Sequence, residues 1–176
     1  MDLRLSLGYL RAEAFLLPMN QKDYVELCRK NDKEGIIAFN KKLVEEYPFL
    51  LPRNRFSGEV VKDYDFSFTE MDSMPDGWRI AFGDELLKEL KEELVKFNFL
   101  DRYRITQIKE KYGGLRWYDS GSPKDSKVYD IISKYERLSE ERCLVCGSPE
   151  VFKNAEFWGP LCEKCYTETY IKYYTK

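Results

Sequence analysis

Four cysteines in two close pairs constrain the fold of this chain more than any other feature of its sequence. Cys143 and Cys146 form the first pair, and Cys162 and Cys165 form the second. Two residues between paired cysteines let one turn present both sulfurs to the same tetrahedral ion. The spacing therefore predicts a four-cysteine Zn²⁺ site with a structural role, because a closed site leaves no coordination position for a water.

Disulfides or loose thiols are the alternative to a metal site for these cysteines. Residues 1–10 contain neither a basic region nor a long apolar stretch, so the sequence predicts no secretory signal. Without secretion a disulfide framework is disfavoured, since cytosolic thiols are kept reduced. We therefore expect a cytoplasmic protein that binds zinc. The remaining cysteine, Cys28, lies on a predicted helix face, which is typical of a small buried apolar residue.

The composition of the chain excludes several classes of function. The sequence contains no histidine. Ser-His-Asp and Cys-His catalysis are therefore excluded, as is every metal site that needs histidine. The net charge of −2 disfavours nonspecific binding of DNA or RNA, which depends on neutralising phosphates with positive side chains. We expect a binding protein in preference to an enzyme, and nucleic acid is not the expected partner.

Hydrophobic periodicity predicts an α+β fold, with a small antiparallel sheet packed with helices and a C-terminal zinc module. Alternating apolar residues predict strands, and apolar residues at helical spacing predict helices. A turn is predicted at residues 73–78, since Pro75 and Gly77 suit turn positions. Besides the hairpin described below, strands are predicted at residues 2–10 and 56–70, and helices at 21–46 in two pieces, at 84–97 with Asp84 as N-cap, and at 128–138.

These elements divide the chain into three segments. Residues 1–55 are expected to hold the first strand and the helical pieces, residues 56–140 the α+β core with the hairpin, and residues 141–176 the zinc module and a last helix. No continuous apolar run is long enough for a transmembrane helix, which needs about 18 residues or more, so we expect no contact with a membrane.

Residues 109–118 read KEKYGGLRWY, which predicts a tight β-hairpin. The adjacent glycines suit both central positions of a two-residue turn. This register places Lys111 opposite Arg116, and like charges in that relation destabilise a sheet by up to about 1 kcal/mol. A bound phosphate, or a carboxylate from elsewhere in the chain, would offset the repulsion. We call the face that carries this pair the basic face; it consists of Gln107, Lys109, Lys111, Arg116 and Tyr118.

The basic face has the components of an anion or nucleotide pocket. Arginine offers a planar fork to a phosphate and lysine a point charge, and an aromatic ring can stack on a base. Two glycines at the turn would let a ligand approach the backbone closely. Each part has an alternative interpretation. The basic face would then be a solvated sheet surface whose charges pair with acidic residues of the chain, and Trp78 would be a core residue that cannot stack on a ligand. The predicted ligand-binding residues are Lys109, Lys111, Gly113, Gly114, Arg116, Tyr118 and Trp78.

Two further clusters have a less distinctive pattern. Glu70, Asp72 and Asp76 lie close together in the sequence and would suit a divalent cation, although a turn with solvated acids is the favoured interpretation. Four tyrosines at helical spacing near the C-terminus predict a helix with an aromatic stripe. That stripe either packs on the core or contacts a second copy of the chain or a host protein; it consists of Tyr166, Tyr170, Tyr173 and Tyr174.

The segments DGWRIAFGDELLKEL, QIKEKYGGLRWY, SEERCLVCG and LCEKC together resemble a group of small bacteriophage and prophage proteins. Those proteins share a hairpin of the KEK-aromatic-GGLR-aromatic type and a C-terminal module with two cysteine pairs. The resemblance covers roughly residues 70–166. It implies no activity, but it implies a phage protein inside a bacterial cell. The positions that match the shared motifs are Lys109, Lys111, Gly113, Gly114, Arg116, Cys143, Cys146, Cys162 and Cys165.

The phage setting favours three functions, because small acidic phage proteins often counter host defences. The first is an anti-defence protein that binds and sequesters an anionic, nucleotide-type immune signal without cleaving it. The second is a protein-binding inhibitor or adaptor that acts on a host defence or transcription protein. The third is a nucleic-acid-binding zinc protein, which the acidic net charge disfavours. A phosphodiesterase with a carboxylate-bound metal is a distant further alternative.

Overall fold

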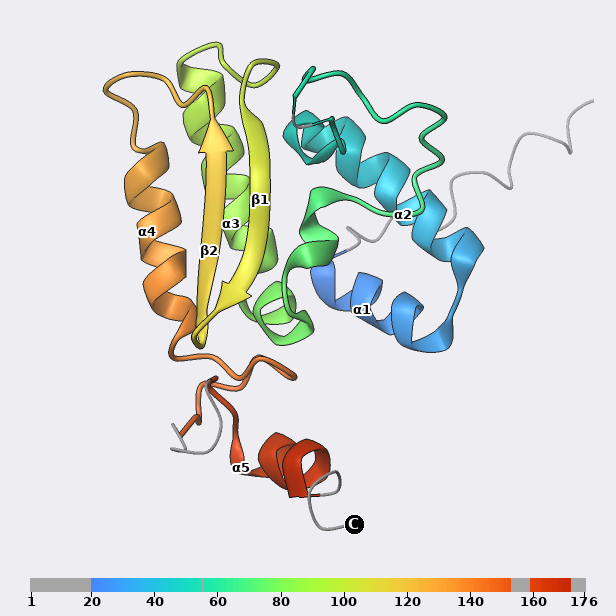
Figure 1. Cartoon of the computed structure of the whole chain (residues 1–176), viewed down its shortest axis with the longest axis vertical. Coiled ribbons are helices and arrows are strands. Elements are labelled where there is room, and N and C mark those ends of the chain that lie inside the picture. Colours follow the sequence, from blue (N-terminus) through green and yellow to red (C-terminus); the bar gives the residue numbers. More distant parts are fainter. Residues whose placement is uncertain (1–19, 55, 153–158, 172–176) are drawn as a thin grey trace, which may run out of the picture.

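Helices packed against a two-stranded antiparallel sheet make up the part of the chain that this computed structural model describes, which is residues 20–54, 56–152 and 159–171 (Figure 1). A cluster of four cysteines lies near the C-terminal end. The prediction of an α+β fold with a C-terminal four-cysteine module is therefore confirmed. The strand predicted at residues 2–10 lies outside the described residues.

The first two helices confirm the two predicted helical pieces. Helix α1 spans Gln21–Lys30 and helix α2 spans Lys33–Glu46. The Asn20 side chain accepts a hydrogen bond from a backbone N–H in the first turn of α1, and the Asp32 side chain does the same for α2. Asn31 lies in the left-handed region at φ 53°, so it ends α1 and turns the chain into α2.

The strand predicted at residues 56–70 is absent, and this prediction is wrong. After a short 3₁₀ helix, η1 (Pro48–Leu50), the chain forms a loop held by an isolated bridge between Arg53 and Val60. Asp63 and Phe66 have φ values of 57° and 64°, which an extended strand cannot accommodate. The alternation of apolar residues here reflects three aromatic rings that pack on one another within the loop, those of Tyr64, Phe66 and Phe68.

Helix α3 spans Asp76–Lys96 and begins earlier than predicted. The predicted turn at residues 73–78 instead contains the end of a 3₁₀ helix, η2 (Glu70–Ser73), and the first turn of α3. Asp84 therefore lies inside α3 and is not its N-cap. Both of its carboxylate oxygens accept from the backbone N–H of Gln21 at 3.1 Å, so Asp84 fixes the start of α1.

Strands β1 (Arg104–Lys111) and β2 (Gly114–Ser120) form the predicted hairpin, and α3 passes behind them (Figure 1). Helix α4, Val128–Ser139, confirms the helix predicted at 128–138 and lies along β2. The β2 edge is closed by α4 side chains: the N–H of Leu115 donates to Ser139 Oγ at 2.8 Å and that of Trp117 to Glu136 Oε1 at 3.0 Å.

One hydrophobic core joins α1, α2, α3, the hairpin and α4, with buried side chains from Tyr24 to Tyr135. A second, small cluster surrounds the cysteines. It includes the start of the last helical segment, α5 (Glu163–Cys165) followed by η3 (Tyr166–Ile171). The division into three segments stays a prediction. None of the described helices has the length and apolar character needed to cross a membrane.

Candidate metal centre and basic hairpin face

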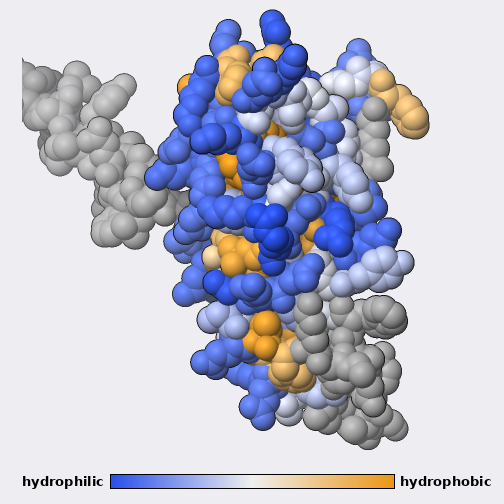
Figure 2. Space-filling view, turned by 90° about the vertical axis from the view of Figure 1, so that its left-hand side faces the viewer, coloured by the Kyte–Doolittle hydropathy of each residue, from blue (hydrophilic) through white to orange (hydrophobic). Residues whose placement is uncertain are grey.

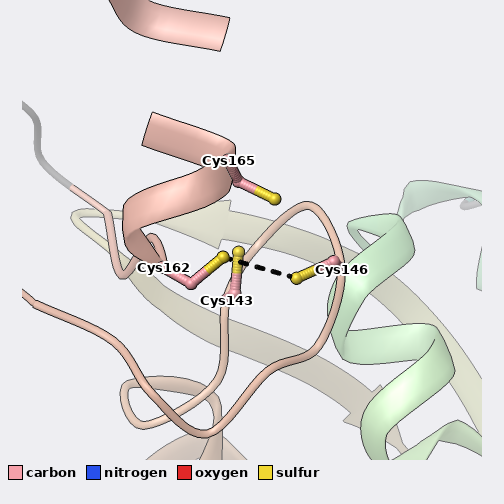
Figure 3. Close-up of side chains that lie close together, drawn as sticks. All are labelled: Cys143, Cys146, Cys162 and Cys165. Carbon is pink, nitrogen blue, oxygen red and sulfur yellow. Dashed lines mark hydrogen bonds between the residues drawn. The ribbon is translucent and has the colours of Figure 1, made fainter. Parts of the chain in front are cut away.

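The sulfur atoms of Cys143, Cys146, Cys162 and Cys165 converge on one point (Figure 3). All of them lie within 4.8 Å of one another, and the Sγ atoms of Cys146 and Cys162 are 3.6 Å apart. A tetrahedral ion with metal–sulfur distances of about 2.3 Å needs sulfur–sulfur distances of about 3.8 Å. The four thiols therefore fit a single metal ion, and thiolates suit zinc or iron.

Tight turns aim the sulfurs of both pairs. In the first pair, the N–H of Gly147 donates to the carbonyl of Cys143 at 2.9 Å, and Gly147 adopts φ 79°, which favours glycine. In the second pair, the N–H of Tyr166 donates to the carbonyl of Cys162 at 2.9 Å, so α5 starts at this pair. Each turn therefore places the two sulfur atoms of its pair on the same side of the chain.

The backbone around the first pair favours a thiolate at Cys143. Burial raises the pKa of this thiol, but N–H groups of Cys162, Cys146 and Val145 donate to the sulfur and bring the pKa down to about 7. Burial raises the pKa of the Cys146 and Cys165 thiols. A bound cation would reverse that effect, because metal binding displaces thiol protons.

The first cysteine pair is docked onto the start of α3. The N–H of Gly77 donates to the carbonyl of Leu144 at 2.9 Å, and Trp78 Nε1 donates to the carbonyl of Arg142 at 3.0 Å. Figure 3 shows α3 beside the loop that carries Cys146. The first pair is therefore attached to the main core by hydrogen bonds that need no metal.

Backbone hydrogen bonds and a ring contact join the second pair to the first. The N–H of Leu144 donates to the carbonyl of Pro160 at 3.0 Å, and the N–H of Phe152 donates to that of Leu161 at 3.0 Å. The Phe152 ring packs edge-on against Tyr166, with ring centroids 5.3 Å apart. Of the predicted aromatic stripe, only Tyr166 has a described side chain; Tyr170 has a described backbone, and Tyr173 and Tyr174 lie outside the described residues.

No family model, curated protein or solved structure matches this chain.

The register of the hairpin differs from the predicted one. Lys109 lies opposite Arg116 and Lys111 lies opposite Gly114, so the turn consists of Tyr112 and Gly113. These two residues have φ values of 55° and 79°, as a type I′ turn requires. The predicted Gly113–Gly114 turn, with Lys111 opposite Arg116, is wrong. The shift moves each pairing by two positions, so every side chain keeps its predicted face.

Contacts outside the turn explain this register. The α4 side chains that bond Leu115 and Trp117 hold β2 in place, and Glu110 Oε1 accepts from the N–H of Gly113 at 2.6 Å. The turn glycines do not offer open backbone to a ligand, because both are buried. A Cβ on Gly114 would lie 2.9 Å from Arg116 Nη1, so the missing side chain makes room for Arg116.

The positive side chains of the basic face, those of Lys109, Lys111 and Arg116, lie next to one another on the hairpin. Lys109 Nζ donates to Gln107 Oε1 at 2.8 Å and lies 5.1 Å from the ring centroid of Tyr118, which is 44% exposed. Arg116 donates to the carbonyl of Leu115 at 2.7 Å. The ion pairs between described residues include none from Lys109, Lys111 or Arg116. The opposite face of the hairpin carries the buried Ile108, Leu115 and Trp117. Figure 1 shows α3 behind the two strands.

Trp78 is not available to stack on a ligand. Its side chain is fully buried in the main core, and its only polar atom is bonded to Arg142. Trp78 is therefore a core residue and not a stacking platform. Tyr118, by contrast, has an exposed ring beside Lys109.

Asp72 belongs to a buried network and is not arranged as a divalent cation site. It accepts from the N–H of Thr69, from the hydroxyl of Tyr24 and, at 3.1 Å, from Arg79. Arg79 is 2% exposed, bonds Gln21 Oε1 at 2.5 Å and stacks 3.7 Å from the centroid of Tyr24. Among the described residues, the cysteines are the group placed to hold a metal. The network joins α1, η2 and α3, and its partners are too far apart in sequence to predict.

Proposed function

We propose that this chain is a binding protein that holds an anionic, nucleotide-type molecule on its basic face. One observation carries the proposal. Lys109 and Arg116 face each other across the hairpin with Lys111 beside them, and no ion pair between described residues involves any of the three. Like charges at directly opposite positions are unfavourable, and a bound phosphate would remove that cost.

The chemistry of the face supports a nucleotide over a simple anion. Arg116 presents a fork that matches two phosphate oxygens, and the lysines add point charges. Tyr118 is exposed at the end of this cluster and lies under Lys109. In the complex a phosphate of the nucleotide would pair with Lys109 and a base would stack on the ring of Tyr118. Stacking on an aromatic ring tolerates any base.

The four-cysteine centre holds Zn²⁺ in this proposal, with a structural role. Zinc would be bound by Cys143, Cys146, Cys162 and Cys165, and it would tie the last helical segment to the core. Four thiolates fill its coordination shell, so the metal takes no part in chemistry on a ligand. The resemblance to phage proteins supports a role in sequestering a nucleotide signal of the host's defence.

Thermal melting of the purified, zinc-loaded chain tests the proposed ligand class. The panel consists of inorganic phosphate, AMP, ATP, and linear and cyclic diadenylate. We expect at least one nucleotide to raise the melting temperature and to be recovered intact by chromatography after heat denaturation. A cleaved product would show an enzyme, and a panel without any shift would contradict the proposal.

A charge reversal on the hairpin gives the matched control. Lys109→Glu with Arg116→Glu should abolish the shift. Lys22→Glu with Lys42→Glu makes the same change in net charge at exposed positions on α1 and α2 and should leave the shift intact. Equal loss in both double variants would mean that overall charge, not the basic face, attracts the nucleotide.

A protein partner is the second candidate, favoured by exposed apolar side chains over the cysteine module. Val145 is 36% and Phe152 38% exposed, and Figure 2 shows apolar side chains gathered at this lower end of the molecule. Val145→Ser and Phe152→Ser would break such an interface, while the charge reversals on the hairpin would leave it intact. Sedimentation velocity over a range of concentrations, on both sets of variants, tests whether a second copy is that partner.

A further inference from the structure

The basic face continues beyond Tyr118, toward the end of the hairpin that lies away from the turn. Arg104 lies opposite Ser120, which is two residues along β2 from Tyr118. A bulge in β1 between Ile105 and Gln107 adds one residue to that strand, so Arg104 and Gln107 lie on the same face of the sheet. The buried Ile105 lies on the other face. Alternation along an unbroken strand would have assigned Arg104 to the core side.

Arg53 lies beside Arg104, in the loop that follows η1. A bridge between Arg53 and Val60 fixes this arginine, and its Nη1 donates to the carbonyl of Gly58 at 2.9 Å. Helix η1 contacts β1, and Figure 1 shows the two side by side. Partial burial and the neighbouring Arg53 guanidinium lower the pKa of Arg104. Two positive side chains therefore meet at the start of β1.

Carboxylates of the described residues form no ion pair with either arginine. Arg104 Nη1 donates to a neutral acceptor, the carbonyl of Tyr103, at 2.8 Å, and Asp101 attracts Arg104 only from a distance. Arg53 Nε is buried and has no hydrogen-bond partner within the described part of the chain. A buried donor without an acceptor is unfavourable, as are two neighbouring like charges. One bound anion would remove both costs.

Two groups of cations thus lie on either side of the Tyr118 ring. The Lys109–Arg116 pair is two residues from Tyr118 in one direction along β2, and the Arg104–Ser120 pair is two residues away in the other. Each step is about 7 Å, so the two pairs lie about 13 Å apart along the strand. Arginine and lysine side chains are long enough to lean toward the ring from both directions.

We propose that Arg53 and Arg104 form a second phosphate site, and that the ligand is a nucleoside with a phosphate chain at both its 5′ and its 3′ position. This rests on the proposed function and names its ligand more closely. With the base on Tyr118, one chain pairs with Lys109 and Arg116 and the other with the two arginines, whose forks match phosphate oxygens. A nucleotide with phosphates at one position reaches one group of cations and leaves the other unneutralised.

Two guanosine tetraphosphates test this arrangement, because they carry the same number of phosphates in different places. Calorimetric titration of the zinc-loaded chain should show that guanosine 3′-diphosphate 5′-diphosphate binds about tenfold or more tightly than guanosine 5′-tetraphosphate. Arg53→Gln with Arg104→Gln should remove this preference and leave the affinity for the 5′-tetraphosphate unchanged, which also shows that the variant is folded. Arg104→Gln alone should remove part of the preference.

A matched pair of substitutions controls for net charge. Lys22→Gln with Lys42→Gln makes the same change at exposed positions on α1 and α2 and should leave the preference intact. Equal loss of the preference in this control would overturn the inference, because overall charge would then explain it.

The remaining outcomes distinguish this inference from the proposed function. Equal affinity of the wild-type chain for the two tetraphosphates would overturn the inference. A preference that survives in Arg53→Gln with Arg104→Gln would overturn it too, and so would a loss of affinity for both compounds in that variant. In each case the proposed function stands if Lys109→Glu with Arg116→Glu abolishes nucleotide binding to an otherwise wild-type chain. Failure of the wild-type chain to bind any nucleotide overturns both.

Discussion

Gly77, in the first turn of α3, lies against Cys143 so closely that a Cβ on Gly77 would fall 2.0 Å from the Cys143 carbonyl oxygen. On the other side of this contact lies Gly147, in the turn of the first cysteine pair. A Cβ on Gly147 would lie 2.6 Å from the Gly77 carbonyl oxygen, so neither position has room for a side chain. The backbone of α3 and that of the first cysteine pair are therefore in direct contact, and the helix start and the metal centre depend on each other.

Gly77→Ala is expected to destabilise the chain by about 1–3 kcal/mol, since backbone atoms must move to admit the methyl group. It should also weaken zinc retention against a chelator. Urea unfolding and a competition titration with a chromogenic chelator measure the two effects. Gly83→Ala on the same helix is a milder change, because its Cβ would meet no backbone atom and would lie 3.0 Å from Cγ of the buried Gln21 side chain. It should cost less stability than Gly77→Ala and leave zinc retention unchanged.

Removal of the metal should release the second cysteine pair and leave the main core folded. The core from Tyr24 to Tyr135 does not include the cysteines, and the first pair is held to α3 by its own hydrogen bonds. Cys162→Ser should abolish zinc binding, lower the melting temperature and keep most of the helical circular dichroism.

Cys28→Ser is the control for that change, because Cys28 lies on α1 and is exposed, so the prediction of a buried residue at this position is wrong. It should retain one zinc per chain in elemental analysis. Loss of the entire helical signal in Cys162→Ser would show that the core cannot form without the metal.

Glu93 should make the stability of the chain depend on acidic pH. It is 5% exposed, and its Oε1 accepts from the N–H of Lys127 at 2.7 Å while its Oε2 contacts Lys96 Nζ at 3.1 Å. These donors hold the pKa of Glu93 below its ordinary value. Its contribution is therefore complete above the ordinary pKa of a glutamate and is lost as the pH falls through the lower, folded-state pKa.

Glu93→Gln should cost about 1.5–3 kcal/mol at neutral pH, the usual contribution of a hydrogen bond to a charged group. Urea unfolding at neutral pH and at successively lower pH should show wild type and variant converging. The neighbouring exposed Glu92→Gln should give a difference close to zero at every pH. A gap that stays constant down to the lowest pH would mean that the charge of Glu93 does not contribute.

Ser139→Ala should destabilise the hairpin by about 1–3 kcal/mol, because the buried N–H of Leu115 loses its acceptor. Ser139 is fully buried, so no water replaces the hydroxyl. Ser133→Ala, on the same helix, should have little effect. Hydrogen exchange at the Leu115 amide, followed by NMR, should speed up in Ser139→Ala only.

Local patterns were enough to predict the cysteine centre and most of the helices. The spacing of the cysteines limits their geometry. Helices α1, α2 and α4 follow from short-range periodicity, and α1 and α2 also begin at capping residues. The residues of the basic face were also predictable, since alternation along a strand is a local property. The choice of faces survived an incorrect register because the shift was by two positions.

Long-range contacts decided the features that the sequence did not predict. The hairpin turns at Tyr112 and Gly113 because side chains of α4 bond the outward N–H groups of β2. The residues of the turn do not indicate these contacts with α4, so the register could not be predicted from them. Asp84 resembles an N-cap, yet it caps a different helix.

The bonds from Ser139 and Glu136 to the N–H groups of β2 have a consequence for solubility. An open strand edge is a template on which another chain can add a strand, and repeated addition leads to fibrils. On the β2 side those donors are already taken by side chains of α4, and the helix itself covers the edge. The chain can thus carry its hairpin at the surface at high concentration without aggregating along this edge.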